Sequence, residues 1–418
     1  MQVVRIDMIE RFFVRFLAAT AAVAVMASSQ GCSQAKDDAP ASSCEVQIDT
    51  FKELMVVDDS VITDDRSKNA LDGPWSFRHA ITGVMPEGAD PSKFILAWLY
   101  NWVNTTEING FKTDLESRVQ EMNTRLVCPW LHATPANACD ATCNTCAGRE
   151  LDLAKAPFKL TAIANRTELA DRPDSASPAG ESRLLFGMTY GPGDDPKSEN
   201  AALSVIFEYA LPVSQTPRQW LDAWHHLGTH AAFDEPFKIE LAELTERFAA
   251  RGVSPERKNG SALAQMRTNE SAFNWIWQMR EFRLDSLGDL RLSTLHNTPG
   301  ESLNNSAALR AYIVANSEAI LADKNLLPLS MLAGSADQLR YRWGAPDVNE
   351  QLRAAFARTT CNGCHSGENP VIDTAFHVSP YRSGKEKLSQ FLYNPADRSH
   401  DELTKRANVM SAKLCAAQ

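Results

Sequence analysis

The sequence lacks the features that define several large functional classes. Beyond its first thirty residues it has no apolar run of about 18 residues, which excludes a protein with several membrane-spanning helices. It has no excess of positive charge: 42 Lys and Arg against 52 Asp and Glu give a net charge of −10, so nucleic acid is not expected as the main partner. The patterns GxSxG, GxGxxG and HExxH and the Walker loop are absent as well. Most of the chain therefore carries no recognisable reaction motif.

The composition is that of a folded protein. Apolar residues make up 44% of the 418 residues and charged residues 22%, an ordinary globular balance. At about 150 residues per domain, this length predicts two or three domains.

The first thirty residues have the pattern of an export signal. The apolar stretch 16–26 follows Arg5, Arg11 and Arg15 and is too short to cross a bilayer comfortably. The next residues, 29–32, read Ser-Gln-Gly-Cys and resemble a lipobox, although a serine stands where that pattern usually has leucine. We therefore predict a lipoprotein signal peptide over residues 1–31 and lipidation at Cys32. The alternative is ordinary secretion with cleavage after Ala27.

A polar segment follows the predicted lipidation site. Residues 32–46 are poor in large apolar side chains and are expected to form a flexible tether. Ser33, directly after Cys32, is similar to the sorting signal of outer-membrane lipoproteins. The expected location is the cell envelope, with a lipid anchor in the outer membrane facing the periplasm, or else secreted or periplasmic.

One motif in the C-terminal region carries chemistry. Cys361-Asn-Gly-Cys364-His365 is the CxxCH pattern of c-type haem attachment. Two thiols at this spacing reach the two vinyl groups of one porphyrin, and the following histidine supplies the proximal imidazole. The motif resembles that of class I c-type cytochromes, and we expect a small, mostly helical cytochrome c-like domain over residues 346–418 that binds haem c.

Two readings without haem stay open for this motif: a reducible CxxC disulfide, or half of a zinc site with His365 incidental. A thioredoxin-like disulfide is expected after a strand. Here an amphipathic helix is predicted before the motif, opened by a capping box of Asp347 and Glu350. This favours haem.

The sixth iron ligand is open between three alternatives. His377 lies in a loop twelve residues after His365 and is ranked first. Met410 has a separation from His365 similar to that of methionine ligands in small cytochromes c, but it is predicted within a helix and is ranked second. An open position is ranked third. The choice matters because the axial ligand changes the redox potential.

The remaining cysteines predict disulfides. Of the nine cysteines, six remain after Cys32, Cys361 and Cys364 are set aside, and six permit three disulfides in an oxidising compartment. Four of them fall between residues 128 and 146, with His132 nearby, but their spacing does not repeat a zinc-ribbon pair. We therefore favour disulfides over a metal there.

Residues 47–345 are predicted to form a body of mixed helices and an antiparallel sheet, and the fold class is α+β. The segments that carry this prediction are helices at 94–103, 111–126, 217–230, 236–251 and 306–322, strands at 158–164, 183–189 and 202–211, and a hairpin of 277–284 with 290–295.

Several charged residues of this body are candidate site residues. Glu181 with Arg183, and Arg267 with Glu270, are candidates for buried ion pairs or for a site. The segment 225–230 contains three histidines, for which a structural or surface role is favoured over a metal pair.

The whole pattern resembles a group of uncharacterised cell-envelope lipoproteins of myxobacteria. The stretches that carry this resemblance are 162–169, 204–209, 220–227, 263–270 and 360–377. The resemblance implies an envelope lipoprotein with a C-terminal haem segment and brings no known activity.

The expected function is single-electron transfer in the cell envelope by a lipid-anchored protein with one covalent haem c. The redox partner is expected to be another envelope protein of unknown identity. Two alternatives are kept: a structural or ligand-binding lipoprotein whose CxxCH is a disulfide, and a peroxidase-like haem enzyme.

Overall fold

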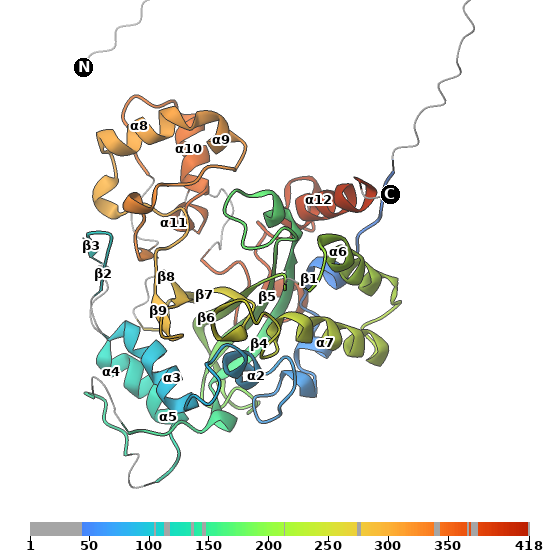
Figure 1. The fold of residues 1–418 in the computed structure, drawn as a ribbon, viewed down its shortest axis with the longest axis vertical. Helices are drawn as coiled ribbons and strands as arrows, with labels where there is room; N and C mark the ends of the chain where they lie inside the picture. Colours follow the sequence, from blue (N-terminus) through green and yellow to red (C-terminus); the bar gives the residue numbers. More distant parts are fainter. Residues whose placement is uncertain are drawn as a thin grey trace, which may run out of the picture. The chain divides into compact units, whose positions relative to one another are not determined.

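The computed structural model describes residues 44–103, 106–112, 118–134, 138–143, 148–212, 214–273, 277–337, 343–365, 368 and 375–416 (Figure 1). The predicted signal peptide, Cys32 and most of the predicted tether lie outside these residues. Glu45–Gln418 form one compact unit.

The centre of this unit is an antiparallel sheet. In the described residues it has eight strands, with the order β1-β4-β5-β6-β7-β8-β10, and β9 also pairs with β8. The strands are β1 (Met55–Val56), β4 (Phe158–Arg166), β5 (Glu181–Tyr190), β6 (Glu199–Ala210), β7 (Leu263–Glu270), β8 (Gln278–Leu284), β9 (Leu290–Leu292) and β10 (Ser335–Asp337). A separate small hairpin joins β2 (Glu107–Ile108) to β3 (Phe111–Lys112).

Helices surround the sheet, so the predicted α+β class is confirmed. They are α1 (Asp59–Ile62), α2 (Phe77–Gly83), α3 (Pro91–Leu99), α4 (Val119–Met122), α5 (Cys128–Trp130), α6 (Pro217–His226), α7 (Glu235–Ala249), α8 (Ala307–Ala315), α9 (Ser317–Leu321), α10 (Glu350–Arg358), α11 (Cys361–Cys364) and α12 (Glu402–Ala416).

One face of the sheet is apolar and forms the main core. Alternate residues of a strand point to the same face, and on this face β5 presents Phe186 while β6 presents Phe207. Phe77 of α2 packs on both rings and stacks on Phe158 of β4 at a centroid distance of 4.3 Å. Helix α7 also contacts β6 on this side.

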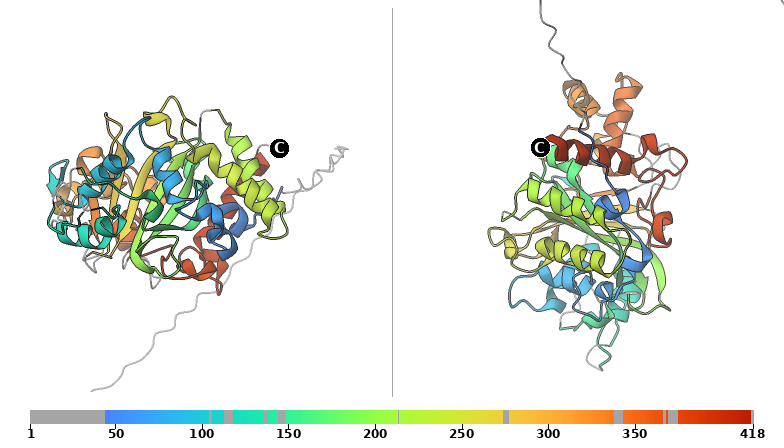
Figure 2. Two further views of the ribbon diagram at one scale, coloured as in Figure 1. Left: turned by 90° about the horizontal axis from the view of Figure 1, so that it is seen from below. Right: turned by 90° about the vertical axis from the view of Figure 1, so that its right-hand side faces the viewer.

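The opposite face is polar and faces the C-terminal segment. Figure 2 shows the red C-terminal segment and the yellow-green helix α7 on opposite sides of the central strands. A second, smaller apolar core joins α8, α9 and α10, and α12 packs on α6 and on residues Thr50–Leu54. The expected separate cytochrome-like domain is not confirmed, because residues 346–416 belong to the same compact unit as the sheet.

Most predicted strands and helices are present, with some differences. The helix expected over 111–126 is wrong at its start: Phe111 and Lys112 form β3, and helix α4 begins at Val119. The helix expected over 306–322 is divided at Asn316 into α8 and α9. The capping box is also wrong, because Asp347 has a φ of 63° and the side chain of Asn349 caps α10 instead.

Four of the six cysteines for which disulfides were expected are disulfide-bonded. Cys128 is bonded to Cys139, and Cys44 and Cys415 are disulfide-bonded too. Cys146 lies outside the described residues. None of the helices that the structure describes combines the length and the apolar character needed to cross a membrane.

Candidate functional site: a charged cavity beside the CxxCH motif

A cavity of about 710 Å³ lies between the polar face of the sheet and the C-terminal segment. Cys361, Cys364, His365 and His377 all line it. The structure therefore brings the residues of the CxxCH motif and the first-ranked candidate for the sixth ligand to one cavity.

The CxxCH motif is held by buried contacts around the short helix α11. The Thr360 hydroxyl accepts a hydrogen bond from the backbone N–H of Gly363 at 3.1 Å. Gly363 packs so closely on α10 that a Cβ at this position would lie 1.9 Å from the carbonyl oxygen of Ala357, so only glycine fits. The Trp343 indole N–H donates to Asn362 at 2.8 Å. The two residues between the cysteines thus hold the thiols in place.

Both cysteines of the motif carry thiols rather than a disulfide. Burial raises the pKa of Cys361, and burial together with the neighbouring Cys361 raises the pKa of Cys364 to about 12. A redox-active CxxC pair or a thiolate metal site needs the opposite, a lowered thiol pKa. The surroundings of these cysteines therefore do not favour either alternative.

His365 is oriented by two contacts. Its ring stacks on Trp277 with a centroid distance of 4.7 Å and an angle of 17°. Its Nδ1 lies 3.1 Å from the carbonyl oxygen of Ala375. Because a carbonyl oxygen only accepts, Nδ1 carries the hydrogen and Nε2 carries the lone pair. This is the orientation that a histidine ligand of iron requires.

His377 lies against His365, with 4.2 Å between the ring centroids. Its Nδ1 is 3.2 Å from Ser389 Oγ and its Nε2 is 3.6 Å from Cys364 Sγ. Burial, followed by the neighbouring charges of His365, Arg406 and Arg166, lowers the pKa of His377 well below its usual value. The imidazole is therefore neutral, the state in which histidine binds a metal.

Met410, the second-ranked candidate, lies elsewhere. Its side chain is completely buried in the main core on α12, and it does not line the cavity. The structure places His377, and not Met410, beside His365.

The polar face of the sheet carries a row of charged side chains, of which Arg183, Glu208 and Arg267 line the cavity. Neighbouring strands alternate in sign: Arg183 of β5 lies 3.2 Å from Glu208 of β6, Glu208 lies 3.0 Å from Arg267 of β7, and Arg267 lies 3.0 Å from Glu281 of β8. Burial would raise the pKa of Glu281, but Arg267 and Arg283 outweigh it, and the pKa is lowered. This face of the sheet is therefore buried and charged.

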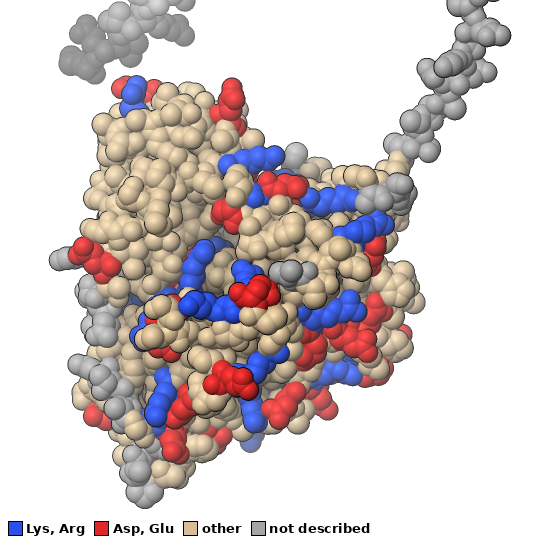
Figure 3. Space-filling view, in the orientation of Figure 1, with Lys and Arg blue, Asp and Glu red and all other residues tan. Residues whose placement is uncertain are grey.

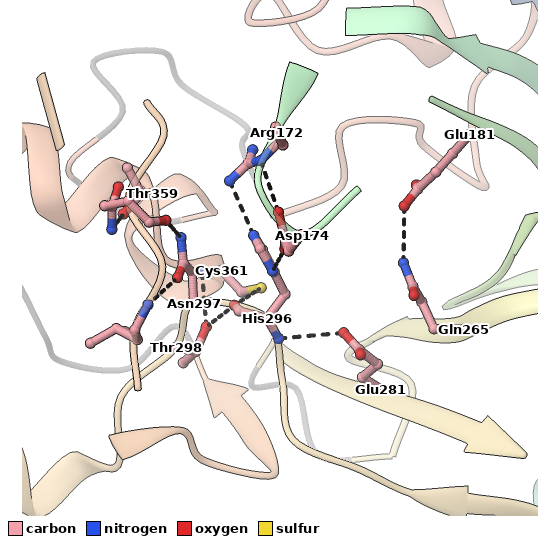
Figure 4. A network of polar contacts seen from close by, with 12 residues as sticks. Arg172, Asp174, Glu181, Gln265, Glu281, His296, Asn297, Thr298, Thr359 and Cys361 are labelled. Atoms are coloured by element: carbon pink, nitrogen blue, oxygen red, sulfur yellow. Dashed lines mark hydrogen bonds and ion pairs between the residues drawn. The ribbon is translucent and has the colours of Figure 1, made fainter. Parts of the chain in front are cut away.

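His296 forms a further polar network at the Cys361 end of the cavity (Figure 4). Its Nδ1 is 2.8 Å from Asp174, its Nε2 is 3.1 Å from Arg172, and its carbonyl oxygen accepts from the thiol of Cys361 at 3.6 Å. Burial would raise the pKa of Asp174, but His296 and Arg172 outweigh it and lower this pKa to about 2.

The cavity is more positive than the chain around it. Eight Lys and Arg residues line it against six Asp and Glu, whereas the whole chain has a net charge of −10. Figure 3 shows Lys and Arg side chains gathered around a hollow beside the uncharged surface at the upper left. One buried polar atom of the lining, Ser204 Oγ, has no hydrogen-bond partner in the described part of the chain. The cavity thus suits an anionic ligand.

The prediction of a metal-binding protein needs correction. The described residues contain no group of three or more His, Cys, Asp and Glu side chains that could hold a metal ion. His365, His377 and Met410 do not form such a group, because Met410 is buried apart from the two histidines. A metal ion held by protein side chains alone is therefore not a property of this part of the chain.

The sequence singled out only part of this lining. The pairing of Glu181 with Arg183 is confirmed, at 2.7 Å. Arg267 and Glu270 do not pair, because three residues of separation along β7 place them on opposite faces. Arg166, Arg172 and His296 were missed, since they come from loops and strand ends distant in sequence; the one signal was the recurrence of arginine along the strands.

The comparisons with known proteins leave the chain without an assigned family. No protein-family model matches it, and neither the curated proteins nor the solved structures include a significant match.

Proposed function

We propose that this chain is an exported envelope lipoprotein that carries one covalent haem c at Cys361 and Cys364 and transfers single electrons. The observation that carries the proposal is the convergence of both thiols, His365 and His377 on one cavity. Lipidation at Cys32 and an unidentified envelope protein as redox partner belong to the same proposal and follow from the sequence alone.

The residues present fit a porphyrin. A cavity of about 710 Å³ lies within the range of about 300–1,000 Å³ usual for small-molecule sites. Its apolar lining includes Met55, Ile206 and Phe391, on which a flat ring can pack, and its positive excess of two charges matches a porphyrin with two carboxylates. The haem brings four iron ligands in its own ring, so the protein needs to add only one or two. The proposed haem therefore does not need the group of three or more protein ligands that a metal ion held by side chains alone would need.

The two thiols would make the attachment. Each thiol adds across one vinyl double bond: the S–H bond breaks, a C–S bond forms, and the hydrogen goes to the other vinyl carbon. Atoms and electrons balance without an oxidant or a reductant. Both thiols have a raised pKa and are therefore protonated at neutral pH.

His365 and His377 are the proposed axial ligands. Nδ1 of His365 donates to the carbonyl oxygen of Ala375, so that its Nε2 carries the lone pair, and Nδ1 of His377 lies 3.2 Å from the Ser389 hydroxyl. The two rings contact each other in the structure, so an iron held between them has to separate them. A haem held by His365 and His377 would supply reversible one-electron chemistry.

The decisive experiment is expression with a c-type haem maturation system. The expected result is a haem that survives denaturation and adds its mass to the peptide containing Cys361–His365. Cys361→Ala with Cys364→Ala abolishes the attachment, whereas Cys143→Ala, at a cysteine that does not line the cavity, leaves it intact. Correctly exported protein without added mass contradicts the proposal.

The same preparation separates the alternatives. Release of the Cys361–Cys364 link by a reductant indicates a disulfide and a structural or ligand-binding protein. A high-spin ferric spectrum indicates an open iron position and a peroxidase-like enzyme. We expect neither: the spectrum is low-spin, and His377→Ala converts it to high-spin while Met410→Leu does not.

A further inference from the structure

Two arginines, one half-buried and one buried, lie together on the cavity wall beside His377. Arg166 ends strand β4 and Arg406 lies on α12, and both line the cavity. Arg406 is only 3% exposed. Both guanidinium groups lie on the same carboxylate, that of Glu168, which Arg406 Nε approaches at 3.2 Å. Two like charges are thus held close together in a region with little water.

Some N–H donors of these two guanidinium groups have no acceptor among the described residues. A guanidinium has five N–H donors. Arg166 donates only through Nε, to Glu168, and Arg406 reaches Glu402 through Nε and Nη2 at 3.3 and 3.4 Å. Within the described part of the chain, the terminal nitrogens of Arg166 and Nη1 of Arg406 have no acceptor. Burial and the neighbouring Arg166 lower the pKa of Arg406, so a further anion here is favourable.

The arginines of the charged row are arranged differently, because all of their carboxylate partners come from the sheet itself. Arg183 contacts Glu181 and Glu208, and Arg267 contacts Glu208 and Glu281, so each has two carboxylates. Their charges are matched within the row. Arg166 and Arg406 instead share one carboxylate, that of Glu168, and Arg406 also contacts Glu402.

We propose that Arg166 and Arg406 form a carboxylate-binding subsite that holds a propionate side chain of the porphyrin. The inference rests on the proposed function, because it places the same cofactor in the same cavity. Two planar guanidinium groups with donors that have no acceptor in the residues that the structure describes suit a carboxylate, which accepts several hydrogen bonds. The subsite would fix the rotation of the ring in the cavity before the thiols react.

The test uses metal-free porphyrins, so that it depends neither on covalent attachment nor on iron. The full chain with Cys361→Ala and Cys364→Ala is titrated with mesoporphyrin IX and with its dimethyl ester, and the quenching of tryptophan fluorescence is measured. We expect the diacid to bind at least about tenfold more tightly than the ester. Adding Arg406→Met reduces this preference to less than about threefold.

Two further variants control for folding and for general charge. Arg406→Lys keeps the charge but loses the planar fork, and is expected to retain only part of the preference. Arg283→Met removes another cavity arginine, which pairs with Glu281 at 2.8 Å, and is expected to leave the preference unchanged. Circular dichroism checks that each variant is folded.

The inference is overturned by equal binding of diacid and ester, by no binding of either, or by an Arg283→Met variant that loses as much preference as Arg406→Met. Arg406-dependent binding of succinate without preference for the porphyrin diacid also overturns it, in favour of a free carboxylate ligand. If haem attaches covalently while these tests fail, the proposed function stands without this subsite.

Discussion

The two faces of the central sheet are both buried but are built from opposite kinds of residue. Phe207 on one face and Glu208 on the other are neighbours in β6, and each is completely buried. Burial of an aromatic ring stabilises the fold, whereas burial of a carboxylate costs several kcal/mol unless partners compensate it. The apolar face therefore accounts for stability, whereas the charged face lines the cavity and depends on its ion pairs to offset the cost of burial.

The largest expected effect tests the apolar face. Phe207→Ala removes a ring that contacts Phe77 and Phe186 in the core, so the free energy of unfolding should fall by about 3–5 kcal/mol. Urea unfolding measures this loss. The matched control is Leu287→Ala, a side chain that is 78% exposed, for which about 0.5 kcal/mol or less is expected. A loss of less than about 1 kcal/mol for Phe207→Ala contradicts the assignment of the core.

The next effect tests the charged face. Glu208→Gln removes the carboxylate shared by Arg183 and Arg267. The free energy of unfolding should fall by about 2–4 kcal/mol, because two largely buried cations lose a partner. Replacing both Glu208 and Arg267 by methionine should cost less than the sum of the two single substitutions. If Glu208→Gln leaves the free energy of unfolding unchanged, the charged side chains of the row are not coupled to one another.

The smallest expected effect is a pH dependence of the free energy of unfolding, and it arises from the His296 network. The pKa of Asp174 is about 2 in the folded chain, below the value of about 3.9 expected in the unfolded chain. Its ion pair therefore stabilises the fold above about pH 4, and this contribution is lost as the pH falls toward 2. Solvent screening limits it to about 1–2 kcal/mol.

Urea unfolding at pH values between 2 and 5 measures this dependence. Asp174→Asn should be less stable than the parent chain at pH 5 and equal to it at pH 2. A constant difference between the two chains over this range shows that Asp174 does not titrate as described.

Sequence patterns predicted the elements in which one face is consistently apolar. Strand β6 alternates Val205, Phe207 and Tyr209 with smaller or polar residues, and it is present as expected. Strand β7 was missed, because Gln265, Arg267 and Asn269 face the cavity and Thr268 and Glu270 lie on the other face, so that neither side of it reads as apolar. When another part of the chain buries a charged face, the strand lacks the alternation of apolar and polar residues from which a strand is predicted.

The sequence also predicted only part of the candidate site. The CxxCH motif and His377 are recognisable because they are close in the chain and because the spacing of the motif is typical of haem attachment. Met410 was a reasonable alternative by spacing, but only the packing of α12 shows that its side chain is in the core.

By itself the sequence determined the α+β class of the body, and it predicts an export-type leader and one short segment for haem attachment, because these depend on local order along the chain. The tertiary structure decided that a charged sheet face forms the other wall of the same cavity. Arg166, Arg406 and His296 are distant from the motif in sequence, and only strand pairing and the return of the C-terminal segment bring them to it. Contacts of this kind depend on which surfaces pack together, and the order of residues along one segment does not contain that information.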